Sequence, residues 1–194
     1  MLFSHRKTWA AGLMGLAAGL LAPALASAAS LDDAVLAELN YARAHPADYA
    51  REMLHDPESF AVDRAAFEEA VDFLERQAPL PPLTGDQRIA AAAREHSRAQ
   101  ASSGAVGHGP AGGLGLRLRD HGVWAGLTAE TIAYGERTPT DVVRQLIVDS
   151  GVPNRGHRNT LFSRGYQLAG VACGPHPQYD VVCVIDFAGA LVQR

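Results

Sequence analysis

The sequence predicts an α+β protein in which helical segments precede a terminal pair of strands. Most of the chain carries apolar residues at helical spacing, whereas two short segments near its end, at about 167–173 and 179–187, are predicted to be strands. The turn expected between them, Gly174 to Pro177, is too short for a crossover helix. These strands should therefore form a hairpin and not a βαβ unit. A chain of 194 residues is long enough for one domain with a buried core.

The first 28 residues are predicted to be a signal peptide. Arg6 and Lys7 precede an apolar segment from Trp9 to Leu21, and small residues suited to signal peptidase follow at Ala24, Ala26 and Ala28. A membrane anchor is the alternative, but the apolar segment is short for a bilayer span and is interrupted at Pro23. We therefore expect a secreted or periplasmic protein without a transmembrane anchor after cleavage, with residues 29–194 as a single domain.

The charge of the chain argues against nucleic acid as a partner. The full sequence has a net charge of −4, and loss of Arg6 and Lys7 with the signal peptide would make it about −6. No basic run is present, whereas nucleic-acid-binding surfaces are basic. Lys7 is the only lysine, so the mature protein has neither Schiff-base chemistry nor a lysine-dependent phosphate loop.

The two cysteines are expected to form a disulfide. Cys173 and Cys183 lie on the two terminal strands, close enough to face each other once the strands pair. An even number of cysteines in an exported chain favours a bridge over free thiols. No CxxC pair is present, which excludes a zinc ribbon and a thioredoxin-like site.

Helices are predicted over much of the first hundred residues. Residues 31–44 carry apolar side chains at helical spacing, and Pro46 can begin a second helix over 47–54. Residues 63–77 form a charged amphipathic helix, which we interpret as an insertion over 62–78.

A longer helix and a glycine-rich loop follow. Thr84 to Gln87 is interpreted as a capping box that opens a helix running to about Ser103. His96 falls on the apolar inner face of this helix, where a hydrogen-bonded core histidine is more common than a ligand. The glycine-rich passage 104–113 carries His108, and a short helix then ends at Gly122.

An extended segment and one more helix are predicted before the hairpin. Residues 123–134 mix β-branched and aromatic residues around Glu130 and should be partly extended. Thr138-Pro139 suits the N-cap and first position of a helix. Asp149 falls at the end of this helix, where a carboxylate opposes the dipole, so we expect it to pair with a cation such as Arg155 or to face a cleft.

Two histidines and a carboxylate from distant segments are candidate site residues. His108 lies between glycines, Glu130 is a single carboxylate in a neutral run, and His157 lies in the polar segment Gly156-His157-Arg158. Imidazole nitrogens bind first-row metals, and a carboxylate on the other ring nitrogen orients the ring. We therefore predict a cleft in which His108 and His157 bind a divalent metal such as zinc, with Glu130 as a ligand or as the orienting carboxylate.

Structural roles are the alternative for each of these residues. His108 would then be a surface loop residue, and Glu130 an acid paired with Arg158 or Arg117. Without a metal, the two histidines and Glu130 would form a hydrogen-bonded cluster with shifted pKa values. Arg158 and Asn159 are expected to fix the local turn. A serine nucleophile is not supported, because no G-x-S-x-G motif is present.

In this order, the residues resemble the CAP superfamily of cysteine-rich secretory, antigen 5 and pathogenesis-related proteins, with their bacterial SCP-like extracellular relatives. The resemblance runs from about Leu31 to the C-terminus and rests mainly on His108, Glu130 and the segment from Gly156 to Leu161. Weaker matches are Leu39-Asn40-x-x-Arg43, Ala93-x-x-His96-Ser97 and Gly170-Val171-Ala172. The resemblance implies a three-layer α-β-α sandwich with a central, mostly antiparallel sheet.

The resemblance also implies a cleft lined by two histidines and two acidic residues, with divalent metal binding in some members. His108, Glu130 and His157 match three of these four positions. The second acid departs from the pattern, because no glutamate precedes His157 at the expected place and Asp149 is the only nearby candidate. Thr131 also stands where an asparagine is usual.

Three functions remain open, since this scaffold carries several activities. The protein is an extracytoplasmic module that binds a divalent metal or small ligand, a metal-assisted hydrolase of peptide or cell-envelope material, or a non-catalytic interaction scaffold. Absence of the second glutamate favours binding or scaffolding, because Glu130 cannot be both ligand and base. The sequence does not decide whether the protein is an enzyme, nor whether its partner is a small ligand or an envelope component.

Overall fold

The computed structural model describes residues 30–56 and 63–192, so the predicted signal peptide lies outside the described residues. Within this part of the chain, helices surround one four-stranded sheet, which confirms the α+β class. In chain order the elements are α1 (Leu31–Ala44), α2 (Pro46–His55), α3 (Arg64–Arg76), β1 (Thr84–Gly85), α4 (Gln87–Ser103), α5 (Gly113–Asp120), β2 (Thr128–Tyr134), α6 (Pro139–Val148), α7 (Gly156–Leu161), β3 (Leu168–His176) and β4 (Asp180–Ala188).

The sheet has the strand order β1-β3-β4-β2 and is mixed. The two-residue strand β1 runs parallel to β3, whereas β4 pairs antiparallel with both β3 and β2. Strand β2 therefore lies at an edge of the sheet. None of the helices in the described residues is both long and apolar enough to cross a membrane.

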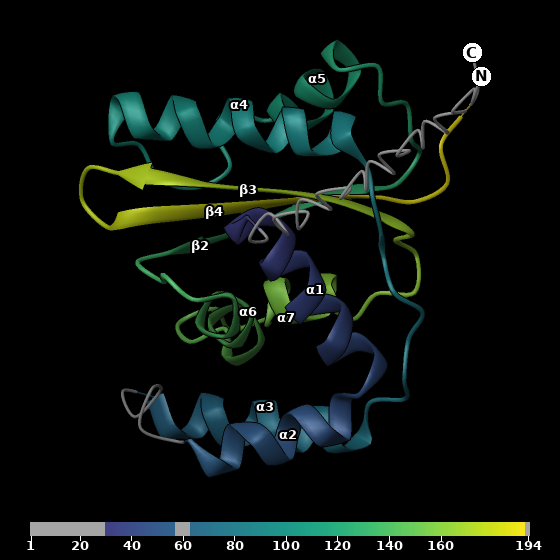
Figure 1. The fold of residues 1–194 in the computed structure, drawn as a ribbon, viewed down its shortest axis with the longest axis vertical. Coiled ribbons are helices and arrows are strands. Elements are labelled where there is room, and N and C mark those ends of the chain that lie inside the picture. Colours follow the sequence, from purple (N-terminus) through teal and green to yellow (C-terminus); the bar gives the residue numbers. More distant parts are fainter. Residues whose placement is uncertain (1–29, 57–62, 193–194) are drawn as a thin grey trace, which may run out of the picture.

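Helices cover both faces of the sheet, as the sandwich prediction requires. Helices α4 and α5 lie on one face, and α1, α6 and α7 lie on the other (Figure 1). Helices α2 and α3 pack against each other beyond α1 and α6 and add an outer layer. The helix predicted at 63–77 is α3, whose N-cap Asp63 accepts a hydrogen bond from the Ala66 N–H at 3.1 Å.

Helix α4 packs against β3 more closely than a side chain at the contact would allow. A Cβ atom on Gly170 would lie 2.0 Å from the backbone nitrogen of Ala90, so only glycine fits beneath the helix. The inner face of α4 contains Ile89 and Ala93, and His96 is buried there as predicted.

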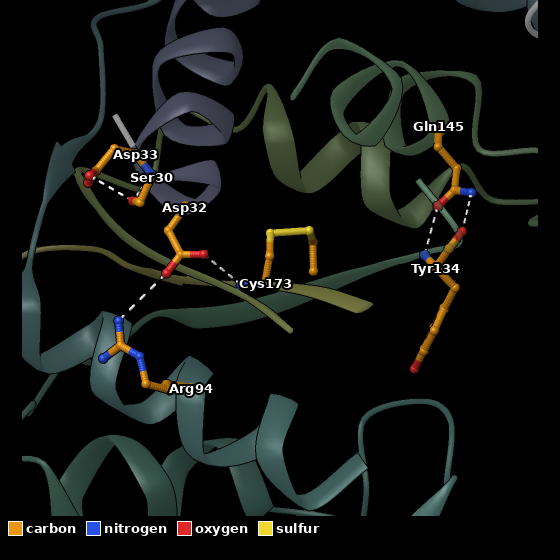
Figure 2. The surroundings of a disulfide bond; sticks show 8 residues. Ser30, Asp32, Asp33, Arg94, Tyr134, Gln145 and Cys173 are labelled. Atoms are coloured by element: carbon orange, nitrogen blue, oxygen red, sulfur yellow. Dashed lines mark hydrogen bonds and ion pairs between the residues drawn. A yellow bond between two sulfur atoms is a disulfide. The ribbon is translucent and has the colours of Figure 1, made fainter. Parts of the chain in front are cut away.

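The disulfide prediction is confirmed. Cys173 and Cys183 are register partners on β3 and β4 and are bonded to each other. Asp32 of α1 reaches this part of β3, where its Oδ1 accepts a hydrogen bond from the Cys173 N–H at 2.7 Å (Figure 2). Asp32 also lies 3.6 Å from Arg94 of α4, so an ion pair connects the two helix layers beside the bridge.

Three local predictions were wrong. The N-cap of α4 is Asp86, whose carboxylate accepts from the N–H groups of Arg88 and Ile89, because Thr84 pairs with β3 instead. The hairpin turn lies at residues 177–179, since β3 continues to His176. Pro175 is tolerated in that strand because β1 pairs with only its first two residues and leaves this part of it at an edge. The local turn expected at Arg158 and Asn159 is instead part of the short helix α7.

Candidate functional site

Asp149 positions His157. We call Asp149, His157 and Arg158 together the His157 arm. Asp149 ends α6 with a left-handed backbone conformation (φ 54°) and is buried. Its Oδ1 lies 2.7 Å from His157 Nδ1, and its Oδ2 accepts from the N–H groups of His157 at 2.9 Å and Arg158 at 3.4 Å. The carboxylate thus orients the ring and also binds the first turn of α7, where a negative charge suits the helix dipole.

Asp149 was expected either to pair with a cation such as Arg155 or to face a cleft. The carboxylate faces the cleft and bonds to His157, so the second of the two expected placements is observed. Arg155 reaches only the backbone oxygen of Asp149, at 2.8 Å, while its guanidinium pairs with Glu69. A cation therefore does not hold this carboxylate directly.

Arg158 has the structural role that was expected of it. Its side chain is buried, donates to the carbonyl oxygens of Ile147 and Val148, and pairs with Glu69 of α3 at 2.8 Å. These bonds satisfy carbonyl groups at the end of α6 and attach α7 to α3. The helix predicted as an insertion thereby supports the site through Glu69.

The His108 arm comprises His108, Glu130 and Arg117. His108 lies in the loop after α4, between Gly107 (φ 83°) and Gly109 (φ 73°), and its side chain is 58% exposed. Its Nδ1 is 2.9 Å from Glu130 Oε1, and the other carboxylate oxygen pairs with Arg117 of α5. Pairing of Glu130 with Arg117 is thus observed, whereas Arg158 lies in the other arm.

The charges of the His108 arm shift the pKa values of its members. The hydrogen bond to Glu130 raises the pKa of His108 above its usual value, although burial opposes this. Burial acts to raise the pKa of Glu130, but the His108 bond and the Arg117 charge outweigh it and lower that pKa. Both shifts favour a charged histidine–carboxylate pair.

His96 belongs to the support of this loop. Its Nε2 lies 2.9 Å from the carbonyl oxygen of Gly107, to which Gln100 also donates at 2.7 Å. Glu130 Oε1 is 3.8 Å from His96 Nε2. His96 therefore fixes the residue that precedes His108, in agreement with the structural role expected for it.

The two arms bring their histidines together. The ring centroids of His108 and His157 are 6.4 Å apart, although the residues come from opposite helix layers. Each ring uses Nδ1 to bond a carboxylate, and the Nε2 atoms make no hydrogen bond to any described residue. A cleft of about 370 Å³ is lined partly by Asp149, His157, Ile132 and Tyr179, so His157 lies in its wall, whereas His108 does not line it.

Asp186 is a buried member of the site that sequence reasoning missed. It is the register partner of Glu130 on β4, is fully buried, and neither of its carboxyl oxygens has a hydrogen-bond partner among the described residues. Burial, and then the charge of Glu130, raises the pKa of Asp186 well above its usual value. The signal in the sequence was a single acid between Ile185 and Phe187 in an apolar strand.

Comparison with known proteins identifies the family. A model of the CAP family, described as the cysteine-rich secretory protein family, matches residues 36–187. No curated protein matches the chain.

Three solved structures that are similar to this chain come from bacteria. An extracellular protein containing an SCP domain from Bacillus anthracis str. Ames is 26% identical with a TM-score of 0.48, and the alignment covers 57% of this chain and 35% of that protein. An outer surface protein from Borrelia burgdorferi is 20% identical with a TM-score of 0.48, covering 57% of this chain and 79% of that one. A cysteine-rich secretory protein from Staphylococcus aureus is 18% identical with a TM-score of 0.45, covering 69% and 39%.

The family match extends over more than half of the chain and includes both arms of the site. His108, Glu130, Asp149 and His157 all lie within residues 36–187. This chain therefore belongs to the CAP family of cysteine-rich secretory proteins.

Proposed function

We propose that the protein is a secreted or periplasmic binding module whose cleft holds a divalent metal, such as zinc, between His108 and His157. The observation that supports this most strongly is the arrangement shared by the two rings. Each has Nδ1 bonded to a buried carboxylate and Nε2 without a hydrogen-bond partner among the described residues. The secretory name of the family and the predicted signal peptide support the location.

The donor set suits a metal with open coordination positions. Histidines that bind metals commonly donate their second ring N–H to a carboxylate, which fixes the tautomer and raises the basicity of the ligating nitrogen. Glu130 and Asp149 are placed for this role. Among the described residues, no group of three or more histidine, cysteine or acidic side chains is arranged to hold a metal. Two protein ligands would leave the remaining positions of a bound metal to water or to a ligand.

The geometry favours binding over hydrolysis. A metal-assisted hydrolase needs a carboxylate or another base that is free to take a proton from the attacking water. Glu130 is engaged by His108 and Arg117, and Asp149 is engaged by His157 and two backbone N–H groups. Both carboxylates near the rings are therefore occupied in orienting them.

Calorimetric titration of zinc into the purified domain tests the proposal. His108→Ala and His157→Ala should each remove most of the zinc binding, because two imidazoles are all that the described site supplies. Glu130→Gln should weaken binding by about 10- to 100-fold, the usual effect of losing an orienting carboxylate. Binding should also weaken as the pH falls through the pKa of His108, since protons compete with the metal.

His121→Ala is the matched control. Its ring also bonds to a carboxylate, with Nε2 3.0 Å from Glu95 of α4, but His121 caps the end of α5 and does not line the cleft. Its replacement should leave zinc affinity unchanged. Zinc affinity that survives replacement of both His108 and His157 would show that the cleft is not a metal site.

A further inference from the structure

Strand β2 has one row of backbone groups that the sheet does not use. Its ladder with β4 is made by odd-numbered residues, as the bonds at its two ends show: Gly189 N–H donates to Leu127 O and Gly135 N–H donates to Val181 O, both at 2.9 Å. In an antiparallel pair the bonding direction alternates along the strand. The N–H and C=O groups of Glu130, Ile132 and Tyr134 therefore point away from β4.

At Tyr134 a side chain already takes the place of a missing strand. Gln145 of α6 donates from Nε2 to Tyr134 O at 2.9 Å, and Tyr134 N–H donates to Gln145 Oε1 at 3.0 Å (Figure 2). A carboxamide presents the same donor and acceptor as a peptide group. This pair of bonds shows that the outward groups of β2 are directed correctly for a peptide partner.

The next outward residues, Glu130 and Ile132, have no such partner. No hydrogen bond from a described residue reaches their outward backbone groups. The Glu130 side chain is only 2% exposed, yet the residue as a whole is partly exposed, so its exposed surface belongs to the main chain. Ile132 is only 6% exposed and borders the cleft, so the edge reaches the surface at Glu130 and continues into the cleft wall at Ile132. Unpaired edges are templates for pairing with another strand.

A pocket for a side chain lies directly beside this edge. The cleft of about 370 Å³ includes Ile132 and Tyr134 in its wall, together with apolar side chains of α6 and the following turn, Leu146, Val148 and Val152. Tyr179 also lines it, and His157 and Asp149 supply part of its polar lining. Backbone hydrogen bonds with a pocket for an alternate side chain are the two features by which sheets bind extended peptides.

We propose that the β2 edge binds an extended peptide segment of another protein. The peptide would pair as an added strand with Glu130 and Ile132 and place one apolar side chain in the cleft. The added strand would end before Tyr134, because Gln145 already bonds the outward backbone groups of that residue. The proposal rests on the sheet edge and the pocket, and it requires no metal.

The test uses amide NMR titrations of the disulfide-bonded domain in the presence of EDTA. The probes are three alternating heptapeptides, Thr-Val-Thr-X-Thr-Val-Thr, in which X is leucine, phenylalanine or tyrosine. With at least one of them, the amide signals of Glu130 and Ile132 should shift and become protected from solvent exchange, while that of Tyr134 should not change its protection. Methylation of the strand-facing amide nitrogens of that peptide should weaken binding about tenfold or more, because each lost bond is worth about 1 kcal/mol.

Val152→Trp and Val192→Trp form a matched pair of variants. Val152 lines the cleft, so tryptophan there should remove peptide binding, whereas Val192 is exposed and outside the cleft, so tryptophan there should have no effect. If none of the peptides protects Glu130 or Ile132 at millimolar concentration, the proposal is wrong, whatever the zinc titrations show. Concentration-dependent protection of these amides in the protein alone would also overturn it, since a second copy of the chain would then be the occupant.

Discussion

The two histidines of the cleft are held in different ways. In the His157 arm, a short helix carries the ring, and a buried aspartate accepts hydrogen bonds from three N–H groups. The adjacent Arg158 is buried against the C-terminal end of α6. In the His108 arm, the ring lies on a loop between two glycines with positive φ and is held by the bond to Glu130. The His157 ring is therefore carried by the folded core, whereas the His108 ring lies on an exposed loop.

This difference predicts that substitutions in the two arms affect different properties. Those in the His157 arm should lower the free energy of unfolding, because they remove bonds inside the core. Substitutions of the exposed His108 ring should change affinity and pH dependence with little loss of stability.

Arg158→Ala should have the largest effect on stability. It removes charged hydrogen bonds to the carbonyl groups of Ile147 and Val148 and leaves those groups buried, so we expect a loss of about 3 to 4 kcal/mol. Urea unfolding of the purified domain measures this. Arg164 is an exposed arginine a few residues away, and Arg164→Ala should change stability by less than about 0.5 kcal/mol. Equal effects of the two substitutions would contradict the role assigned to Arg158.

Reduction of the Cys173–Cys183 disulfide should lower the free energy of unfolding slightly less than Arg158→Ala does. A loop of this size gives about 2.5 to 3 kcal/mol in the chain-entropy model, and the main core does not depend on the bridge. The melting temperature should fall, the domain should stay folded, and zinc affinity should not change, since β3 carries neither histidine. Loss of zinc binding on reduction would show that the hairpin and the site are coupled.

The smallest expected effect is the pH dependence of the stability that His108 contributes. Because the pKa of His108 is raised in the folded protein, the charged pair with Glu130 stabilises fully below the unfolded value of about 6.5 and is lost as the pH rises through the folded pKa. Parent and His108→Gln should differ by at most about 1 kcal/mol near pH 6, because the ring is mostly exposed, and the difference should shrink toward pH 9. A difference that stays constant over this range would refute the assignment.

The sequence predicted most of the fold because local signals agree with the tertiary structure. Spacing of apolar residues gave α1, and Thr138-Pro139 marked the start of α6 correctly. The cap of α4 was misplaced because Thr84 and Asp86 are both good capping residues, and only pairing with β3 decides between them. Strand β1, with two residues, has no periodicity that a sequence could show.

The sequence pointed to residues that the structure brings close together, but it did not indicate the hydrogen bonds among them. His108, Glu130 and His157 stand out as polar residues in unusual local contexts, but the partner of each depends on which segments pack together. Asp149 bonds to His157 because α6 ends in a left-handed conformation that turns it toward α7. Asp186 was missed because its role comes from lying opposite Glu130, which only the strand register establishes.

The central claim is that both rings present a free Nε2 to the same metal. Heteronuclear NMR of the imidazole rings in the metal-free domain at alkaline pH tests it most directly. Because the carboxylates bond to Nδ1, both rings should be Nδ1–H tautomers, and the Nε2 signals of His108 and His157 should shift together on addition of one equivalent of zinc. An Nε2–H tautomer in either ring, or a zinc response confined to one of them, would contradict the account.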